Sequence, residues 1–178
     1  MSVWLFETAR LGARPPTADD LAAMVAVYGD AEAMRYVGDG EALTAERCQE
    51  WLAVIEQRYA LKGYGMAALC RRSDEVVLGF CGVVHPELRP LGEIKYALAR
   101  EHWGQGYATE AVRGMLEYIA KNFSPTQIAA TVNPAHLRSQ QVLSKAGMLK
   151  GGLRANADGS FTQLFWWREP TEADLQSV

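Results

Sequence analysis

One stretch decides the fold: Glu93-Ile-Lys-Tyr-Ala-Leu98, the turn Trp103-Gly-Gln-Gly-Tyr-Ala108, and the residues that continue to Phe123. Its first part predicts a strand, because large apolar side chains alternate there with Glu, Lys and Ala. Its last part predicts an amphipathic helix, because apolar residues recur every three or four positions. The turn between them feeds the helix N-terminus, where unpaired N–H groups and glycines suit a bound anion such as phosphate.

Several kinds of loop are compatible with such a turn. A tight strand-to-helix connection without a ligand explains Gly104 and Gly106 as well as an anion site does. A dinucleotide-binding loop fits less well, because its third glycine would fall on Thr109 and no acid ends the next expected strand, 127–132. A P-loop is excluded because Gly-Lys-Ser/Thr is missing. The residues alone therefore leave a plain turn and an anion site as alternatives.

The composition predicts a single globular domain over residues 1–178. Hydrophobic residues make up 49% and charged residues 22%, and the sequence has no internal repeat or linker-like segment. A net charge of −3 argues against a nucleic-acid-binding protein. No apolar run reaches the roughly 18 residues of a membrane span, and the first residues lack the pattern of a signal peptide. We therefore expect a cytoplasmic protein that binds neither nucleic acid nor membrane.

Cysteine and histidine patterns indicate neither disulfides nor metal. Cys48, Cys70 and Cys81 are odd in number and lie in apolar patterns, which suits a reducing compartment. The three histidines are scattered, and the sequence contains no Cys-x-x-Cys or His-Glu-x-x-His. We therefore expect no metal site.

The order of expected elements predicts an α+β fold with a mixed sheet. Thr17 and Thr44 are expected to cap two N-terminal helices, ended by Gly29 and Gly63. The polar tail 169–178 is expected to fray. The expected strands are 10–14, 65–70, 76–84, 93–98, 127–132, 148–153 and 161–167, and a further helix follows Pro134 and ends at Gly147.

Two blocks of the sequence resemble a known family. The block Trp103-Gly-Gln-Gly-Tyr-Ala-Thr-Glu-Ala111 is similar to the pyrophosphate loop of GNAT-type acyl-CoA N-acetyltransferases, in particular the ribosomal-protein-alanine (RimJ/RimL-type) branch. The block Asn133-Pro-Ala-His-Leu-Arg-Ser139, with Val142-Leu-Ser-Lys-Ala-Gly-Met148, resembles the family's Asn-Pro-x-Asn-x-x-Ser…Val-Leu-Glu-Lys-x-Gly-Phe. The resemblance implies a GNAT-like fold, with a mixed, mostly antiparallel central sheet flanked by helices. It also implies acetyl-CoA as co-substrate.

The resemblance further implies where coenzyme A is held. His136 stands where the family usually has Asn, and it is expected to contact pantetheine. Arg100, Arg138 and Lys145 lie in or near the two motifs and are candidates for phosphate contacts, although such residues are more often surface charges. The remaining expected contacts come from the strand backbone at Tyr96, Ala97 and Leu98, and from the loop residues Trp103, Gly104, Gln105, Gly106, Tyr107, Ala108 and Thr109.

Two residues are candidates for the chemistry. Ser139 matches the family's serine, whose hydroxyl binds the leaving sulfur, and the alternative is a helical serine bonded to its own backbone. Glu93 is the candidate base, acting through water on the attacking ammonium, and the alternative is a solvated charge or a partner of Lys95. Acetyl transfer needs no covalent enzyme nucleophile, so the lack of Gly-x-Ser-x-Gly is no objection.

We therefore expect an acetyl-CoA-dependent N-acetyltransferase that acts on a primary amine by direct attack in a ternary complex. The amine is a protein N-terminus or a small molecule, and the net charge is too small to choose between acceptors. A catalytically silent acyl-CoA-binding or regulatory module is the alternative. The chain is expected to be a monomer or a homodimer, the latter through the aromatic last strand. Candidates for the acceptor-pocket walls are Trp51, Tyr59, Trp166 and Trp167.

Overall fold

A computed structural model describes residues 3–178. Its strands form one eight-stranded sheet. The strand order is β1-β2-β3-β4-β5-β6-β8-β7, and all neighbours are antiparallel except β5 and β6. The α+β prediction with a mixed, mostly antiparallel sheet is thereby confirmed. The strands are β1 (Phe6–Glu7), β2 (Leu11–Arg14), β3 (Met66–Arg71), β4 (Val77–Val84), β5 (Gly92–Leu98), β6 (Ile128–Val132), β7 (Leu149–Ala155) and β8 (Phe161–Trp166).

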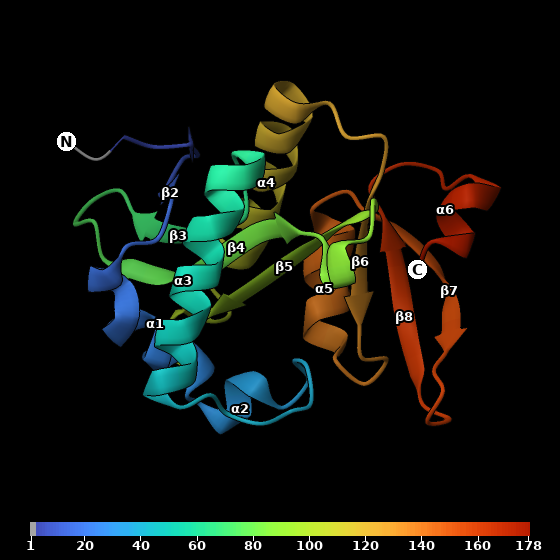
Figure 1. The fold of residues 1–178 in the computed structure, drawn as a ribbon, viewed down its shortest axis with the longest axis horizontal. Coiled ribbons are helices and arrows are strands. Elements are labelled where there is room, and N and C mark those ends of the chain that lie inside the picture. The colour runs from blue at the N-terminus through green and yellow to red at the C-terminus, as the bar shows by residue number, and fades with distance from the viewer. Residues whose placement is uncertain (1–2) are drawn as a thin grey trace.

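Helices cover both faces of the sheet (Figure 1). On one face, α1 (Leu21–Tyr28), α2 (Ala31–Met34) and α3 (Ala45–Lys62) pack on a buried cluster around Phe80. On the other face, α4 (Tyr107–Phe123) and α5 (Leu137–Lys145) pack on a cluster around Ile94. The remaining helical segments are η1 (Ala18–Asp20), η2 (Pro86–Leu88), η3 (Arg100–His102) and α6 (Glu172–Gln176).

The helix α3 begins and ends as its sequence predicts. Thr44 Oγ1 accepts a hydrogen bond from the N–H of Arg47 at 3.3 Å, which satisfies one free donor of the first turn. Gly63 follows the last turn with φ of +76°, the left-handed conformation that glycine adopts without strain. Local capping residues thus determine both ends of this helix.

Two glycines hold β4 close to its neighbours. A Cβ on Gly79 would lie 2.2 Å from the carbonyl oxygen of Ala97 on β5. A Cβ on Gly82 would lie 2.2 Å from the carbonyl oxygen of Gly65, just before β3. A side chain at either position would therefore collide with the neighbouring backbone, which explains why glycine stands there.

The strands β5 and β6 pair over only two residues. The parallel register joins Gly92 to Ile128 and Glu93 to Ala129, after which the strands diverge. On its other side, β5 pairs with β4 from Glu93 to Leu98. The β6-facing edge of β5 therefore has no strand partner beyond Glu93.

Several features differ from the expectations. The tail contains α6, capped by Thr171, and Val178 packs on Trp166 and its neighbours, so it does not simply fray. β8 lies between β6 and β7, so a dimer could not add a strand to it. The strand β1 was not predicted. The three cysteines are buried and unpaired, and none of the helices within residues 3–178 has the length and apolar character to cross a membrane.

Candidate active site

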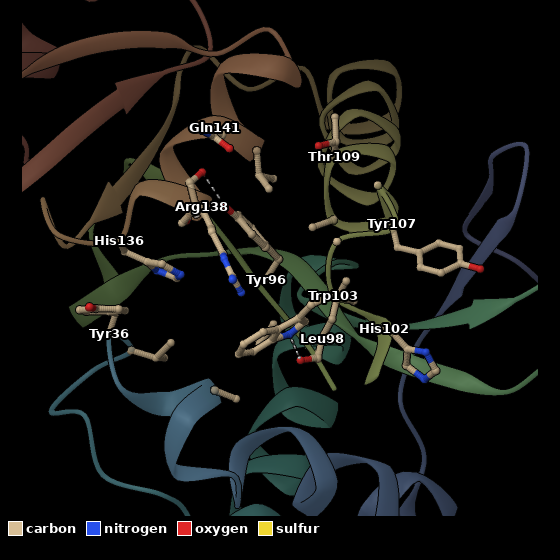
Figure 2. Close-up of a pocket in the computed structure, with 18 of the residues that line it drawn as sticks. Tyr36, Tyr96, Leu98, His102, Trp103, Tyr107, Thr109, His136, Arg138 and Gln141 are labelled. Carbon is tan, nitrogen blue, oxygen red and sulfur yellow. Dashed lines mark hydrogen bonds between the residues drawn. The ribbon is translucent and has the colours of Figure 1, made fainter. Parts of the chain in front are cut away.

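The gap between β5 and α5 holds a cavity of about 570 Å³ (Figure 2). Nearly all the residues predicted to hold coenzyme A line it. Among the predicted strand, loop and second-motif residues, Gln105 is the exception, because its side-chain amide turns back to the carbonyl of Glu101 at 3.0 Å. The predicted residues that line this first cavity are Tyr96, Ala97, Leu98, Trp103, Gly104, Gly106, Tyr107, Ala108, Thr109, His136 and Ser139.

The turn before α4 has the geometry of an anion cradle. Gly104 and Gly106 have φ of +72° and +82°, so both positions require the left-handed conformation. Gly106 is the N-cap of α4, whose free N–H groups and positive dipole end begin there. The indole Nε1 of Trp103 donates to the carbonyl of Leu98 at 2.8 Å, which fixes the start of the loop to β5.

Arg10, which sequence reasoning missed, braces this loop from outside the cavity. Its Nη1 donates to the carbonyl oxygen of Gln105 at 2.9 Å, and its guanidinium lies 4.3 Å from the ring centroid of Tyr107. Its Nε donates to Oε2 of Glu110 at 2.7 Å. In a trans peptide the N–H points opposite to the C=O, so this bond directs the N–H of Gly106 away from Arg10.

The free edge of β5 presents backbone donors beside the cavity. Ala99 N–H donates to the carbonyl of Leu78 at 2.9 Å, which fixes the phase of the β4–β5 ladder. In an antiparallel ladder alternate residues bond to the same neighbour. The N–H groups of Tyr96 and Leu98 therefore do not bond β4. They point to the opposite edge of β5, which is not paired with β6 at these residues.

Tyr96 and Ser139 form a hydroxyl pair inside the cavity. Tyr96 Oη lies 2.7 Å from Ser139 Oγ and also donates to the Ser139 carbonyl at 3.2 Å. The Ser139 hydroxyl thus bonds the phenol, whereas the alternative interpretation has it bonding its own backbone. Burial raises the pKa of Tyr96, although the bond to Ser139 partly opposes the rise, so the phenol is protonated at neutral pH.

His136 stacks on a tyrosine from the opposite wall. The rings of Tyr36 and His136 lie 4.8 Å apart with an interplanar angle of 26° (Figure 2). Burial lowers the pKa of His136, and the charge of Arg138 lowers it further. The imidazole is therefore neutral near pH 7 and can both donate and accept a hydrogen bond.

Two of the three predicted phosphate-binding cations reach the first cavity. Arg138 and Lys145 line it, and the guanidinium of Arg138 extends into it (Figure 2). Arg100 lines neither this cavity nor the one beside it, because its Nη2 bonds Oδ2 of Asp30 at 2.5 Å.

A second cavity, of about 760 Å³, adjoins the first. Of the four aromatic residues expected to wall an acceptor pocket, Trp51 lines it, whereas Tyr59, Trp166 and Trp167 do not. Trp166 is 1% exposed and belongs to a separate core cluster. The two cavities share Tyr36, Val37, Tyr96, Ala97, His136 and Ser139.

Glu93 lies behind the wall of the second cavity. It is 6% exposed and lines neither cavity, and its Oε2 accepts bonds from Lys95 Nζ at 2.6 Å and Thr131 Oγ1 at 2.9 Å. Burial alone would raise the pKa of Glu93, but Lys95 and Thr131 hold it below its usual value. Lys95 and Thr131 themselves line the second cavity. The carboxylate is thus a partner of Lys95, and its role as a base stays a prediction.

Residues 10–149 match the family described as the acetyltransferase (GNAT) domain. The chain belongs to this family. Two bacterial proteins are similar to this chain in sequence. The N-acetyltransferase p20 of Bacillus licheniformis is 27% identical over 149 residues, covering 82% of this chain and 83% of p20. YkkB of Bacillus subtilis (strain 168) is 39% identical over 92 residues, which span 49% of this chain and only 53% of YkkB.

Solved GNAT structures share the fold at low sequence identity. A GNAT-family acetyltransferase from Bacillus anthracis has a TM-score of 0.75 at 20% identity, covering 90% of this chain and 95% of that chain. AAC(6')-Ib in complex with ribostamycin and coenzyme A has a TM-score of 0.71 at 19% identity, with 95% and 97% covered. RimL, a ribosomal L7/L12 acetyltransferase in complex with coenzyme A, has a TM-score of 0.74 at 12% identity. The match covers 89% of this chain and 94% of RimL. At 12% identity the likeness is one of fold, so the RimJ/RimL-type branch is not established.

Proposed function

We propose that this GNAT protein moves an acetyl group from acetyl-CoA to a primary amine by direct attack in a ternary complex. One observation carries the proposal: the two cavities meet at the Tyr96–Ser139 hydroxyl pair. The first cavity would take acetyl-CoA and the second the amine. Direct transfer requires both substrates at one point, and two adjoining cavities provide that arrangement.

The residues present fit coenzyme A. The N–H groups of the Gly104–Gly106 turn and the first turn of α4 are suited to its pyrophosphate. Arg138 and Lys145 supply positive charge at the same cavity. The N–H groups of Tyr96 and Leu98 are suited to the pantetheine amides, which would extend the sheet like an added strand. When bound, acetyl-CoA supplies the activated thioester.

The hydroxyl pair is suited to stabilising the departing thiolate. Ser139 Oγ can donate a hydrogen bond to sulfur while the protonated phenol of Tyr96 donates to Ser139. A backbone N–H on the free edge of β5 can polarise the thioester carbonyl. In this proposal Glu93 is the base and acts through water. Lys95 and Thr131 bond its carboxylate and line the second cavity.

The test separates an enzyme from a silent binding module. Acetyl-CoA binding is measured by calorimetry, and thiol release is followed with peptides starting in Ala or Ser, polyamines, aminoglycosides and free amino acids. We expect binding and amine-dependent thiol release. Binding without release from any amine would favour the silent module. Competition of NAD or ATP with acetyl-CoA would favour a nucleotide-binding domain.

A further inference from the structure

The second cavity is cationic in a chain whose net charge is −3. Asp39 is the only aspartate or glutamate that lines it among the described residues. The lysine and arginine residues that line it are Arg35, Arg58, Lys95 and Arg154.

Two of these four cations have protein partners. Lys95 bonds Glu93 at 2.6 Å, and Arg35 lies 3.8 Å from Glu32. Within residues 3–178, the guanidinium groups of Arg58 and Arg154 make no hydrogen bond or ion pair within the chain. Arg154 is half-buried and close enough for its charge to lower the pKa of Glu93. A partly buried guanidinium without a hydrogen-bond partner leaves its five N–H donors available to a ligand.

We propose that the amine acceptor carries an anionic group, which Arg58 and Arg154 bind beside Lys95. The inference rests on the proposed function, because it takes the second cavity as the acceptor site. Arg58 belongs to α3 and Arg154 to β7, which lie on either side of β5 and β6 (Figure 1). The guanidinium group binds carboxylate and phosphate through two parallel hydrogen bonds, so both anions suit this chemistry.

The same charges disfavour polycationic acceptors. Among the residues that the structure describes, Asp39 is the only acidic one that lines the second cavity, so aminoglycosides and polyamines would meet mainly like charges there. The likeness to AAC(6')-Ib, at 19% identity, is one of fold alone and does not argue for an aminoglycoside acceptor. The reacting amine would lie at the Tyr96–Ser139 end and the anion toward Arg154, so that one acceptor spans the cavity.

The test compares acceptors that differ only in charge. The probes are the dipeptide amides Ala-Glu, Ala-Gln and Ala-Lys, with Ala-phosphoserine to distinguish phosphate from carboxylate. Their dissociation constants are measured by calorimetry on the coenzyme A-loaded protein, and their KM values by thiol release. We expect Ala-Glu or Ala-phosphoserine to bind about tenfold more tightly than Ala-Gln, and Ala-Lys to bind most weakly. The preference should shrink with added salt.

Variants assign the preference to the two arginines. Arg154→Gln and Arg58→Gln should each reduce the preference for the anionic dipeptides several-fold. The dissociation constant of Ala-Gln should change little. Arg47→Gln is the control, because Arg47 lies on α3, is 70% exposed and lines neither cavity. Equal affinities for the three dipeptides, a preference for Ala-Lys, no binding of any probe, or a preference that survives both substitutions would overturn the inference. A charge preference in binding without acetylation would instead count against the proposed function alone.

Discussion

The phenol oxygen of Tyr96 lies 2.7 Å from the hydroxyl oxygen of Ser139, although the two residues are 43 positions apart. One comes from β5 and the other from α5, so the pair joins the free edge of the sheet to the second motif. Strand alternation places Tyr96 on the same face as Ile94 and Leu98. The contact makes Tyr96 more than a backbone donor, because its side chain supports the serine expected to face the leaving sulfur.

Removing either hydroxyl should slow turnover more than it weakens binding. We expect Ser139→Ala to lower kcat by about 100-fold, since it removes a donor to the departing thiolate. Tyr96→Phe should lower kcat by about tenfold, and the double variant should lose less than the product of the two effects, because the hydroxyls act as a pair. Steady-state kinetics and acetyl-CoA calorimetry provide the measurement. A selective loss of acetyl-CoA binding in Ser139→Ala would reverse the assignment.

The pH dependence of turnover tests Glu93. Its pKa is lowered, so the carboxylate is ionised at neutral pH and takes up a proton only as the pH falls below its usual value of 4.5. We expect Glu93→Gln to lower kcat and to flatten the low-pH limb of the rate profile. Lys95→Met removes the cation that lowers this pKa, so the limb should move to higher pH. A profile unchanged in Glu93→Gln would remove Glu93 from the mechanism.

Arg10 should affect coenzyme binding without touching the coenzyme. Arg10→Gln removes the brace on the Gln105 carbonyl, and we expect the KM for acetyl-CoA to rise about fivefold, because an exposed charged contact contributes roughly 1 kcal/mol. Arg72→Gln is the matched control, since Arg72 bonds the Thr8 carbonyl at 2.9 Å and Glu7 at 3.2 Å but does not touch the loop. Equal effects of the two variants would show that the loop needs no brace.

A buried ion pair near the N-terminus should govern acid stability. Asp20 is 4% exposed and binds the Arg14 guanidinium through both oxygens, at 2.7 and 2.8 Å. Burial acts to raise the pKa of Asp20, but Arg14 and the N–H of Thr17 hold it below its usual 3.8. The pair therefore stabilises the fold above that value, and the contribution is lost as the pH falls through the lower, folded-state pKa.

Urea unfolding at pH 7 and near pH 3 measures this effect. We expect Asp20→Asn to lower the free energy of unfolding at pH 7 by about 3 kcal/mol, because it leaves a partly buried arginine without its anion. The variant should lose less stability than the native chain on acidification. Asp74→Asn is the control: Asp74 binds Arg71 through both oxygens but is 44% exposed, and little change is expected. Equal losses in the two variants would contradict the role of burial.

Local patterns in the sequence predicted the elements, but not the contacts between distant ones. The alternation around Tyr96 and the caps of α3 are properties of a few neighbouring residues, and the structure confirms both predictions. Arg10 meets Glu110 across 100 positions, and no local period signals such a contact. The parallel pairing of β5 with β6 likewise joins segments that are distant in the sequence, and no local pattern specifies it.

The candidate site divides in the same way. The resemblance of two motifs to the GNAT family indicated which segments would line the first cavity, whereas the glycine turn alone left a plain turn and an anion site as alternatives. The position of Gln105 outside it depends on one side-chain rotamer, which the motif does not specify. The sequence did not indicate Arg154, because it lies in a mostly exposed strand without a motif. The folded sheet brings it to the second cavity.

The two-residue pairing of β5 with β6 has a thermodynamic consequence. A co-substrate that occupies the free edge of β5 binds the folded chain and not the unfolded one, so it stabilises the native state by mass action. At a concentration 100 times its dissociation constant, the gain is about 2.7 kcal/mol. Resistance to proteolysis would then rise with the concentration of any coenzyme A species that occupies this edge.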